Sequence, residues 1–250
     1  MVEDHPSSEM RLTRRPLKEL VRPFTSLLVG SIHGARTDEP LVSFTFDDGP
    51  DPHETPRLLR ALGENDARAT FFILGERARC YPEFVRSIRA AGHEVGLHAD
   101  VHRRLTELPL RQVADDIRRS KHDLEAILDE SIRLFRPPYG FLTRGGYLIA
   151  RSLSLKVVAW SAEAKDWLEL PVERLVANAL AQLEPGGILL LHERHEPPPL
   201  HGPTFDRELL VRILLAEIAS RGWRSVPVGE LIAGRPLDKR LWFRMPAQST

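Results

Sequence analysis

Two adjacent carboxylates, Asp47 and Asp48, follow an apolar, β-rich segment in the hexapeptide TFDDGP at residues 45–50. Adjacent carboxylates beside a buried segment cost free energy unless a cation compensates them. A divalent metal ion would do so if one carboxylate bound it while the other stood beside it as a base. An acidic turn accounts for the same residues equally well, because Asp, Gly and Pro favour turns. The segment alone leaves both alternatives open.

A pair of histidines, His98 and His102, stands four residues apart after another apolar segment. If this segment turns helically, both imidazoles face the same way and could reach one ion. With one aspartate they would supply three ligands and leave a position open for water, as catalytic sites do. Zn²⁺ suits these donors best, although Co²⁺, Ni²⁺ or Mn²⁺ could bind the same set. Chance spacing among the ten histidines of the chain is the alternative.

Arg136 precedes the segment PPYG at residues 137–140. At a strand end, its guanidinium could hold a neighbouring carboxylate ionised and oriented. The two prolines restrict the loop, so a backbone N–H there could be preset for an oxyanion. A surface arginine followed by a rigid turn is the alternative.

His192 closes the apolar run ILLL at residues 188–191. It could transfer a proton if a carboxylate oriented it, whereas taken alone a structural histidine with a satisfied partner explains it better. Another polar cluster, WSAEAKDW, spans residues 160–167. We expect His195 and His201, which come later, to belong to a solvated loop rather than to the rim of a site.

Apolar segments with strand and helix patterns alternate along the chain and must position these residues. Strands are expected at 41–46, 70–74, 94–98, 133–136, 156–160, 188–191 and 223–227, and helices at 54–64, 82–91, 110–128, 143–153, 172–183 and 205–220. This alternation predicts an α/β fold with a parallel sheet and right-handed crossovers. Seven such units indicate a barrel. A doubly wound open sheet stays possible, because periodicity does not reveal closure.

Five polar clusters thus occupy the ends of five different expected strands. Parallel barrels carry their functional residues at the carboxyl ends of the strands, in the loops that follow. One mouth of a barrel could therefore gather all five clusters. This shared placement favours a single site over five unrelated surface features.

The composition restricts the classes of partner. The chain has 250 residues, 42% of them hydrophobic, and its 35 Lys and Arg balance its 35 Asp and Glu. This composition is globular, and zero formal charge gives no electrostatic reason to expect nucleic acid or an anionic membrane. Cys80 is the only cysteine, which excludes an intramolecular disulfide and a cysteine-based metal cage. No apolar run approaches the roughly 20 residues of a membrane-spanning helix.

One folded domain at residues 37–235 is expected, with a polar and basic leader at 1–36 and a tail at 236–250. The apolar patch of the leader, 24–30, contains Thr25 and Ser26. It falls short of the run of about 7–15 apolar residues that a secretory signal needs. We therefore expect a cytoplasmic protein, with export as the alternative. The sequence contains no indication of the oligomeric state.

Five motifs, which appear in the family's order, give the chain a resemblance to the polysaccharide deacetylase family, carbohydrate esterase family 4, also called the NodB homology domain. The first, third and fifth are TFDDGP at 45–50, RPPYG at 136–140 and LLH at 190–192, and the similarity extends over about residues 39–232. The resemblance implies a distorted (β/α)₇ barrel, which agrees with the seven strands counted from periodicity, and assigns residues 37–235 to a catalytic domain.

The resemblance also implies roles for the conspicuous residues. Asp48, His98 and His102 would hold the divalent metal, most simply Zn²⁺. Asp47 would be the general base that activates metal-bound water, and Arg136 would orient Asp47.

Further roles follow from the same resemblance. His192 would protonate the leaving amine and would itself be held by Asp166. The backbone N–H of Tyr139 would stabilise the oxyanion, while Trp167 and Leu190 would wall the pocket for the acetyl methyl group.

The chain departs from the family pattern at three positions. The second family motif is usually H[ST]xxH preceded by Asn, whereas here Leu97 precedes His98 and Ala99 follows it. Ala99 cannot supply the hydroxyl that usually braces this loop. In the fourth motif, usually DxxDW, Glu163 replaces the first Asp. None of these changes removes an expected ligand or proton carrier.

We therefore expect a metal-dependent hydrolase that removes N-acetyl groups from N-acetylhexosamine residues of a polysaccharide, oligosaccharide or amino sugar. The alternative is a deformylase or deacetylase acting on a cytoplasmic or lipid-linked amino-sugar intermediate. It is suggested by the segment EVGLHA at 94–99, which resembles the deformylases of the lipid A aminoarabinose pathway. A non-catalytic carbohydrate-binding protein would have lost a ligand or the base, and neither is lost.

Overall fold

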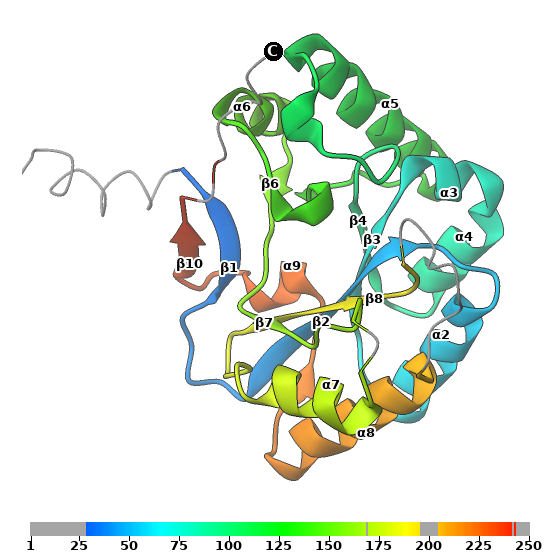
Figure 1. Cartoon of the computed structure of the whole chain (residues 1–250), viewed down its shortest axis with the longest axis vertical. Coiled ribbons are helices and arrows are strands. Elements are labelled where there is room, and N and C mark those ends of the chain that lie inside the picture. Colours follow the sequence, from blue (N-terminus) through cyan, green and yellow to red (C-terminus); the bar gives the residue numbers. More distant parts are fainter. Residues whose placement is uncertain (1–28, 169, 196–204, 242, 244–250) are drawn as a thin grey trace, which may run out of the picture.

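The computed structural model describes residues 29–168, 170–195, 205–241 and 243. A curled, parallel sheet forms its centre, with strand order β6-β5-β4-β3-β2-β8-β7 and with β9 paired to β2 (Figure 1). Every pair in this sheet is parallel. The strands are β2 (Leu41–Gly49), β3 (Thr70–Ile73), β4 (Glu94–Leu97), β5 (Leu134–Phe135), β6 (Lys156–Val157), β7 (Ala162–Glu163), β8 (Ile188–His192) and β9 (Arg224–Ser225). The predicted α/β fold and barrel-like sheet are confirmed.

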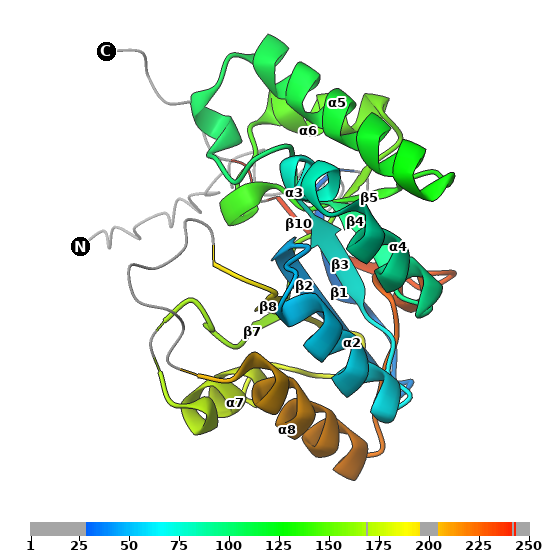
Figure 2. The same cartoon turned by 90° about the vertical axis from the view of Figure 1, so that its right-hand side faces the viewer.

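Helices surround the curled sheet, and all except the last, α9, which packs against the apolar cluster on the inner face, cover its outer side (Figures 1 and 2). They are α2 (Glu54–Glu64), α3 (Gly75–Cys80), α4 (Pro82–Ala90), α5 (Leu110–Leu128), α6 (Arg144–Ser152), α7 (Val172–Leu180), α8 (Arg207–Ser220) and α9 (Val228–Leu231), with short 3₁₀ turns η1 (Leu105–Glu107) and η2 (Pro138–Gly140). Among the helices of the described ranges, none combines the length and hydropathy that crossing a membrane requires.

The larger of two apolar cores lies between the outer helices and the sheet, and the smaller lies on the inner face of the sheet with β1 (Ser31–Ala35) and α9. Strands β2 and β3 are buried along their whole length, and the rings of Phe46 and Phe71 stack with centroids 4.9 Å apart. Helix α5 buries Val113, Ile117 and Leu124 on one face. This is the face that their spacing predicts, because residues three, four and seven apart share one side of a helix. The apolar pattern therefore places both α5 and the central strands.

Several predicted boundaries differ from the observed ones. The helices expected at 54–64 and 110–128 have those bounds, but the strand expected at 223–227 is reduced to two residues of β9. The prediction also missed α3, α9 and β7. Strand β7 has two residues, which is too short for an alternating pattern.

A second sheet pairs β1 (Ser31–Ala35) antiparallel with β10 (Leu237–Arg240), and the two lie side by side in Figure 1. Both strands fall inside the segments that the sequence analysis placed outside the domain. All five residues of β1 are buried, and Ile32 is only 3% exposed. For these residues, the expected leader and tail must be corrected, because their contacts belong to the folded domain.

Strand β1 also fills the space between the two edges of the main sheet. Ile32 forms a parallel bridge with Val158, beyond β6, and Gly34 forms an antiparallel bridge with Gly187, before β8. A Cβ on Gly34 would lie 2.6 Å from the carbonyl oxygen of Gly186, so this close approach requires glycine. The barrel is thus completed by a strand that the sequence analysis assigned to the leader.

Candidate active site

Asp47 and Asp48 lie within β2, which continues to Gly49, and not after the strand as expected. Their exposures are 3% and 2%, so the acidic-turn alternative does not describe them. Adjacent side chains of an extended strand face opposite sides. The positive φ of 72° at Asp48 interrupts this alternation, and both carboxylates line the same pocket. Such a left-handed backbone persists only where the surrounding structure holds it.

His98 and His102 come from the loop after β4. Their Nε2 atoms lie 3.3 Å and 3.6 Å from Oδ1 of Asp48. The segment does not turn helically, because Ala99 has a left-handed φ of 68° and the segment is irregular. The loop, rather than an i, i+4 helical face, brings the two rings together.

These three side chains fit a divalent cation. Their potential ligand atoms all lie within 4.8 Å of one another. Nδ1 of His98 contacts the carbonyl oxygen of Arg136 at 2.7 Å, which leaves Nε2 to face Asp48. Oδ1 of Asp48 is buried and has no hydrogen-bonding partner among the described residues. One carboxylate and two imidazoles with such a buried acceptor form a donor set that a divalent metal ion could bind, with a position left open for water.

The protonation states favour metal binding. Burial lowers the pKa of His102 to about 4, which keeps this imidazole neutral near pH 7. Burial raises the pKa of Asp48, but the nearby His98, His192 and His102 outweigh it, so that the pKa lies below the ordinary value. A neutral imidazole and an ionised carboxylate are the forms that ligate metal.

Arg136 and Asp47 form a buried ion pair on one side of these ligands. Nη1 of Arg136 donates to Oδ1 of Asp47 and to Oγ1 of Thr45, each at 2.7 Å, and Nη2 donates to the carbonyl oxygen of Ala159 at 2.9 Å. The guanidinium also lies 4.2 Å above the ring centroid of Phe72. A fully buried charge needs such partners. They leave Oδ2 of Asp47 facing the ligand cluster, 3.8 Å from Nε2 of His98.

His192 and Asp166 form a second pair at the end of β8. Nδ1 of His192 contacts Oδ1 of Asp166 at 2.8 Å, and the backbone N–H of His192 donates to Oδ2 at the same distance. Burial lowers the pKa of His192, but the charge and hydrogen bond of Asp166 prevail and raise it to about 9. The imidazole is therefore protonated at neutral pH. The ring of Trp167 meets it edge-on at 5.6 Å.

A cavity of about 450 Å³ joins these groups. Its lining residues are Asp47, Asp48, His98, His102, Tyr139, Gly140, Phe141, Trp160, Glu163, Trp167, Leu190, His192 and His195. Arg136 and Asp166 are not among them and act on the pocket through Asp47 and His192. The five clusters expected at one mouth of the barrel therefore all reach this cavity, directly or through one neighbour.

The turn η2 shapes one wall of the cavity through Tyr139 and Gly140. Tyr139 has a left-handed φ of 59°, and its ring lies 4.5 Å from that of His102. Gly140 also has a positive φ, and a Cβ there would lie 2.7 Å from the indole of Trp160. Glycine is therefore required at this position for the turn and for its close contact with the aromatic wall.

Sequence reasoning missed several lining residues. His195, expected in a solvated loop, lines the cavity and stacks on His192 with centroids 6.2 Å apart. His201 lies outside the described residues. Trp160 and Phe141 line the cavity, and Nε1 of Trp160 donates to Glu163 at 3.0 Å. The only available signal was their position after expected strands, which does not distinguish a wall residue from a core residue.

Comparison with known proteins places this geometry in context. Residues 34–158 match the family model described as polysaccharide deacetylase. A chitooligosaccharide deacetylase from Bradyrhizobium sp. (strain ANU 289) is 32% identical over 208 residues, which cover 81% of this chain and 93% of that protein. A peptidoglycan-N-acetylglucosamine deacetylase from Bacillus cereus is 32% identical over 200 residues, or 78% of this chain and 89% of that protein.

A solved structure is also similar. It is a family 4 carbohydrate esterase from Streptomyces lividans in complex with acetate, with a TM-score of 0.68 and 28% identity. The match covers 81% of this chain and 99% of the esterase. The similarity in sequence and that in fold therefore both extend over most of the chain.

Proposed function

The chain belongs to the polysaccharide deacetylase family, and on that premise we propose that it is a metal-dependent hydrolase of N-acetylated sugars. The substrates would be N-acetylhexosamine residues of an oligosaccharide or polysaccharide, as the names of the two relatives suggest. One observation carries the proposal: three candidate ligands, a candidate base and a candidate acid converge on a single cavity.

Asp48, His98 and His102 would hold the cation. Zn²⁺ is our proposed metal, because one oxygen and two nitrogen donors suit it, and the family resemblance implies such an ion. When bound, the cation would lower the pKa of a water molecule and polarise the acyl carbonyl. The protein contributes a buried, preformed set of ligands, with His98 held in one tautomer by its hydrogen bond to the Arg136 carbonyl.

Asp47 would be the general base. Its Oδ1 is occupied by Arg136, so Oδ2 is the oxygen that would take a proton from the attacking water. The arginine restricts the orientation of the carboxylate through this charge-assisted hydrogen bond. Arg136 is therefore a positioning residue, since it acts on the reaction through Asp47.

His192 would be the general acid. The water oxygen first forms its bond to the acyl carbon and gives a tetrahedral adduct with an oxyanion. When this adduct collapses, the C–N bond breaks, and the imidazolium gives its proton to the departing amine nitrogen. The products are acetate and a free amino sugar. Asp166 keeps His192 protonated and fixes its ring through Nδ1.

The remaining lining residues would bind the acyl group. The backbone N–H of Tyr139 would donate to the developing oxyanion. Leu190, which is 3% exposed, and Trp167, which is 41% exposed, both line the cavity beside His192 and would contact the acetyl methyl group. The alternative, a deformylase or deacetylase acting on a cytoplasmic or lipid-linked amino-sugar intermediate, is not favoured, because the two relatives are named as deacetylases of chitooligosaccharide and of peptidoglycan N-acetylglucosamine.

The test is acetate release by the purified protein from chitooligosaccharides, peptidoglycan fragments and small N-acetylated amino sugars, with N-formylated sugars in parallel. We expect release of acetate that stops with a chelator and returns with Zn²⁺. The His98→Ala variant should bind no stoichiometric metal and release no acetate. Absence of metal-dependent release from every N-acetyl substrate would contradict the proposal, and release of formate alone would favour the alternative.

A further inference from the structure

The loop between His98 and His102 is held from outside the cavity by a buried aspartate of α5. The backbone N–H of Asp100 donates to Oδ1 of Asp116 at 2.8 Å, and Asp116 is 2% exposed. This contact is notable because Ala99, next to it, has no side-chain hydroxyl with which the loop could brace itself. The acceptor comes instead from a helix, 16 residues further along the chain.

The same carboxylate contacts the loop on both sides of His102. Its Oδ2 accepts from Nη2 of Arg103 at 2.9 Å, so that one side chain binds the residues two before and one after this histidine. Asp116 is itself restrained on α5, where its carbonyl oxygen accepts from Oγ of Ser120 at 2.6 Å. The ligand His102 is thus tied to a long, well-packed helix.

Helix α3 holds the other side of the loop. The N–H of Gly75 donates to the carbonyl oxygen of Ala99 at 2.9 Å, and that of Glu76 donates to the carbonyl oxygen of Asp100 at 3.0 Å. The Asp100 side chain, which is 3% exposed, binds Arg79 at 2.7 Å and also Arg119. The carbonyl oxygens of Ala99 and Asp100, and the N–H and side chain of Asp100, therefore all have partners on α3 or α5.

From these contacts we infer that Asp116 is a positioning residue that sets the spacing of His98 and His102 and thereby the metal affinity of the site. The inference rests on the metal-binding part of the proposed function. The left-handed backbone of Ala99 costs free energy, and only external contacts can maintain it. Without Asp116, the N–H of Asp100 would be buried with no acceptor, and the loop would relax to satisfy it.

The experiment measures Zn²⁺ affinity by competition with a chromophoric chelator, using the metal-free full-length protein. We expect Asp116→Ala to weaken Zn²⁺ binding about 10- to 100-fold, the usual effect of losing a partner that orients a ligand. Asp116→Asn keeps an oxygen for the Asp100 N–H but loses the charge that Arg103 contacts, so its loss should be smaller. Asp115→Ala is the matched control. It removes a carboxylate from the residue next to Asp116 on the same helix, but the Asp115 side chain is 64% exposed.

Activity provides a second readout. If Asp116 acts through metal affinity, excess Zn²⁺ should restore kcat in the Asp116 variants and leave KM unchanged, whereas a damaged pocket would not recover. Should Asp116→Ala fail to fold, Asp116→Asn and Arg103→Ala carry the same test with smaller expected losses. Zn²⁺ binding as tight as in the wild type, for every folded variant, would overturn the inference. A wild-type protein that binds no Zn²⁺ would instead contradict the proposed function itself.

Discussion

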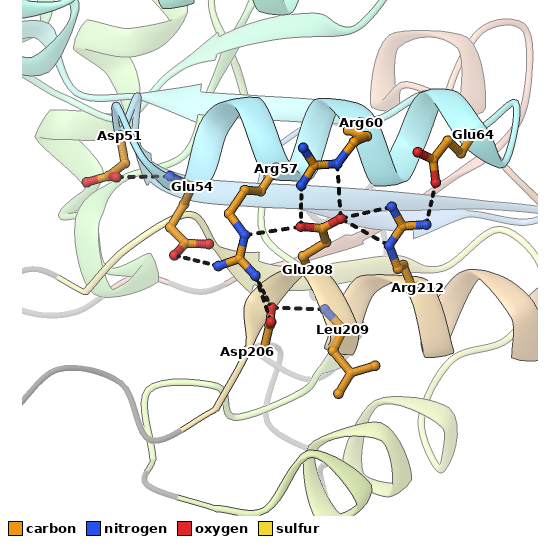
Figure 3. A network of polar contacts seen from close by, with 9 residues as sticks. All are labelled: Asp51, Glu54, Arg57, Arg60, Glu64, Asp206, Glu208, Leu209 and Arg212. Atoms are coloured by element: carbon orange, nitrogen blue, oxygen red, sulfur yellow. Dashed lines mark hydrogen bonds and ion pairs between the residues drawn. The ribbon is translucent and has the colours of Figure 1, made fainter.

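Two networks of charged side chains in this protein use the same chemistry in opposite surroundings. The α2–α8 network joins two helices on the surface (Figure 3) and consists of Glu54, Arg57, Arg60, Glu64, Asp206, Glu208 and Arg212. There, Arg60 meets Glu208 at 2.7 Å, the same distance that separates Arg136 from Asp47 in the cavity. Yet the side chain of Arg60 is 54% exposed and that of Arg136 is 0% exposed.

The comparison shows that distance alone does not measure the importance of an ion pair. At the surface, water and salt screen the charges, and Glu208 has three arginine partners, any of which can replace another. In the cavity, Asp47 depends on a single arginine, and water cannot compensate its loss. The α2–α8 network lowers the pKa of Glu208 to about 2, chiefly through the hydrogen bond from Arg60. The arginines that cause this shift do not line the cavity.

The largest effect should come from Asp48→Ala, which removes the ligand that faces both histidines. We expect loss of stoichiometric Zn²⁺ and acetate release at background level, since two imidazoles alone form an incomplete site. Metal analysis after gel filtration and the acetate assay measure these two losses, with Asp115→Ala as control. If Asp48→Ala kept both its metal and its activity, this cavity residue would be as dispensable as a surface residue, and the comparison would fail.

Arg136→Ala should be nearly as severe, because it leaves the Asp47 carboxylate buried without its partner. We expect a loss of about 3–5 kcal/mol in the free energy of unfolding, together with loss of activity. Urea unfolding followed by circular dichroism gives the free energy. Arg136→Lys sharpens the test, since it keeps the charge but lacks the planar fork that reaches Asp47, Thr45 and Ala159 together. Stability equal to the wild type in both variants would show that this buried pair is as dispensable as a surface one.

Asp166→Asn should change the pH dependence more than the fold. The general acid works only when protonated, so activity should fall as the pH rises through the pKa of His192, which Asp166 helps to raise to about 9. Without the Asp166 charge, this alkaline limit should move to lower pH. The pH profile of kcat/KM measures the shift, and an unchanged alkaline limit would show that Asp166 does not set the pKa of His192.

The same pair should contribute to stability with a definite sign. Because the pKa of His192 is raised on folding, from 6.5 to about 9, its contribution is complete below 6.5 and disappears as the pH rises to about 9. The difference in unfolding free energy between the wild type and Asp166→Asn should therefore be larger at pH 6 than at pH 10.

Arg60→Ala should have the smallest effect. Glu208 keeps Arg57 and Arg212, so we expect the Tm to fall by less than about 4 °C, with acetate release unchanged. The decrease should be smaller in 1 M NaCl, which screens exposed pairs. Calorimetry at low and high salt measures it. A decrease as large as that of Arg136→Ala would contradict the role assigned here to burial.

Much of the site could be predicted because its residues lie in short, contiguous motifs. TFDDGP, RPPYG and LLH each combine a strand end with a polar residue, and the amphipathic pattern of α5 gives its length without knowledge of its neighbours. Glu163 and Ala99 were recognised as departures, but their consequences were not. Glu163 accepts a hydrogen bond from Trp160, and the loop at Ala99 is braced by Asp116, neither of which sequence reasoning foresaw.

The sequence by itself determined the kinds of polar residues, their order and their placement at strand ends, because these are local properties of apolar periodicity and motif spacing. Only the tertiary structure decided that β1 pairs with β10, about 200 residues away, that β1 bridges the main sheet at Val158 and Gly187, and that His195 lines the cavity. Such pairings depend on contacts between distant segments, and strands of two to five residues are too short for periodicity to identify their partners. Burial is the property that distinguishes the Arg136–Asp47 pair from the Arg60–Glu208 pair. It too depends on contacts between distant segments.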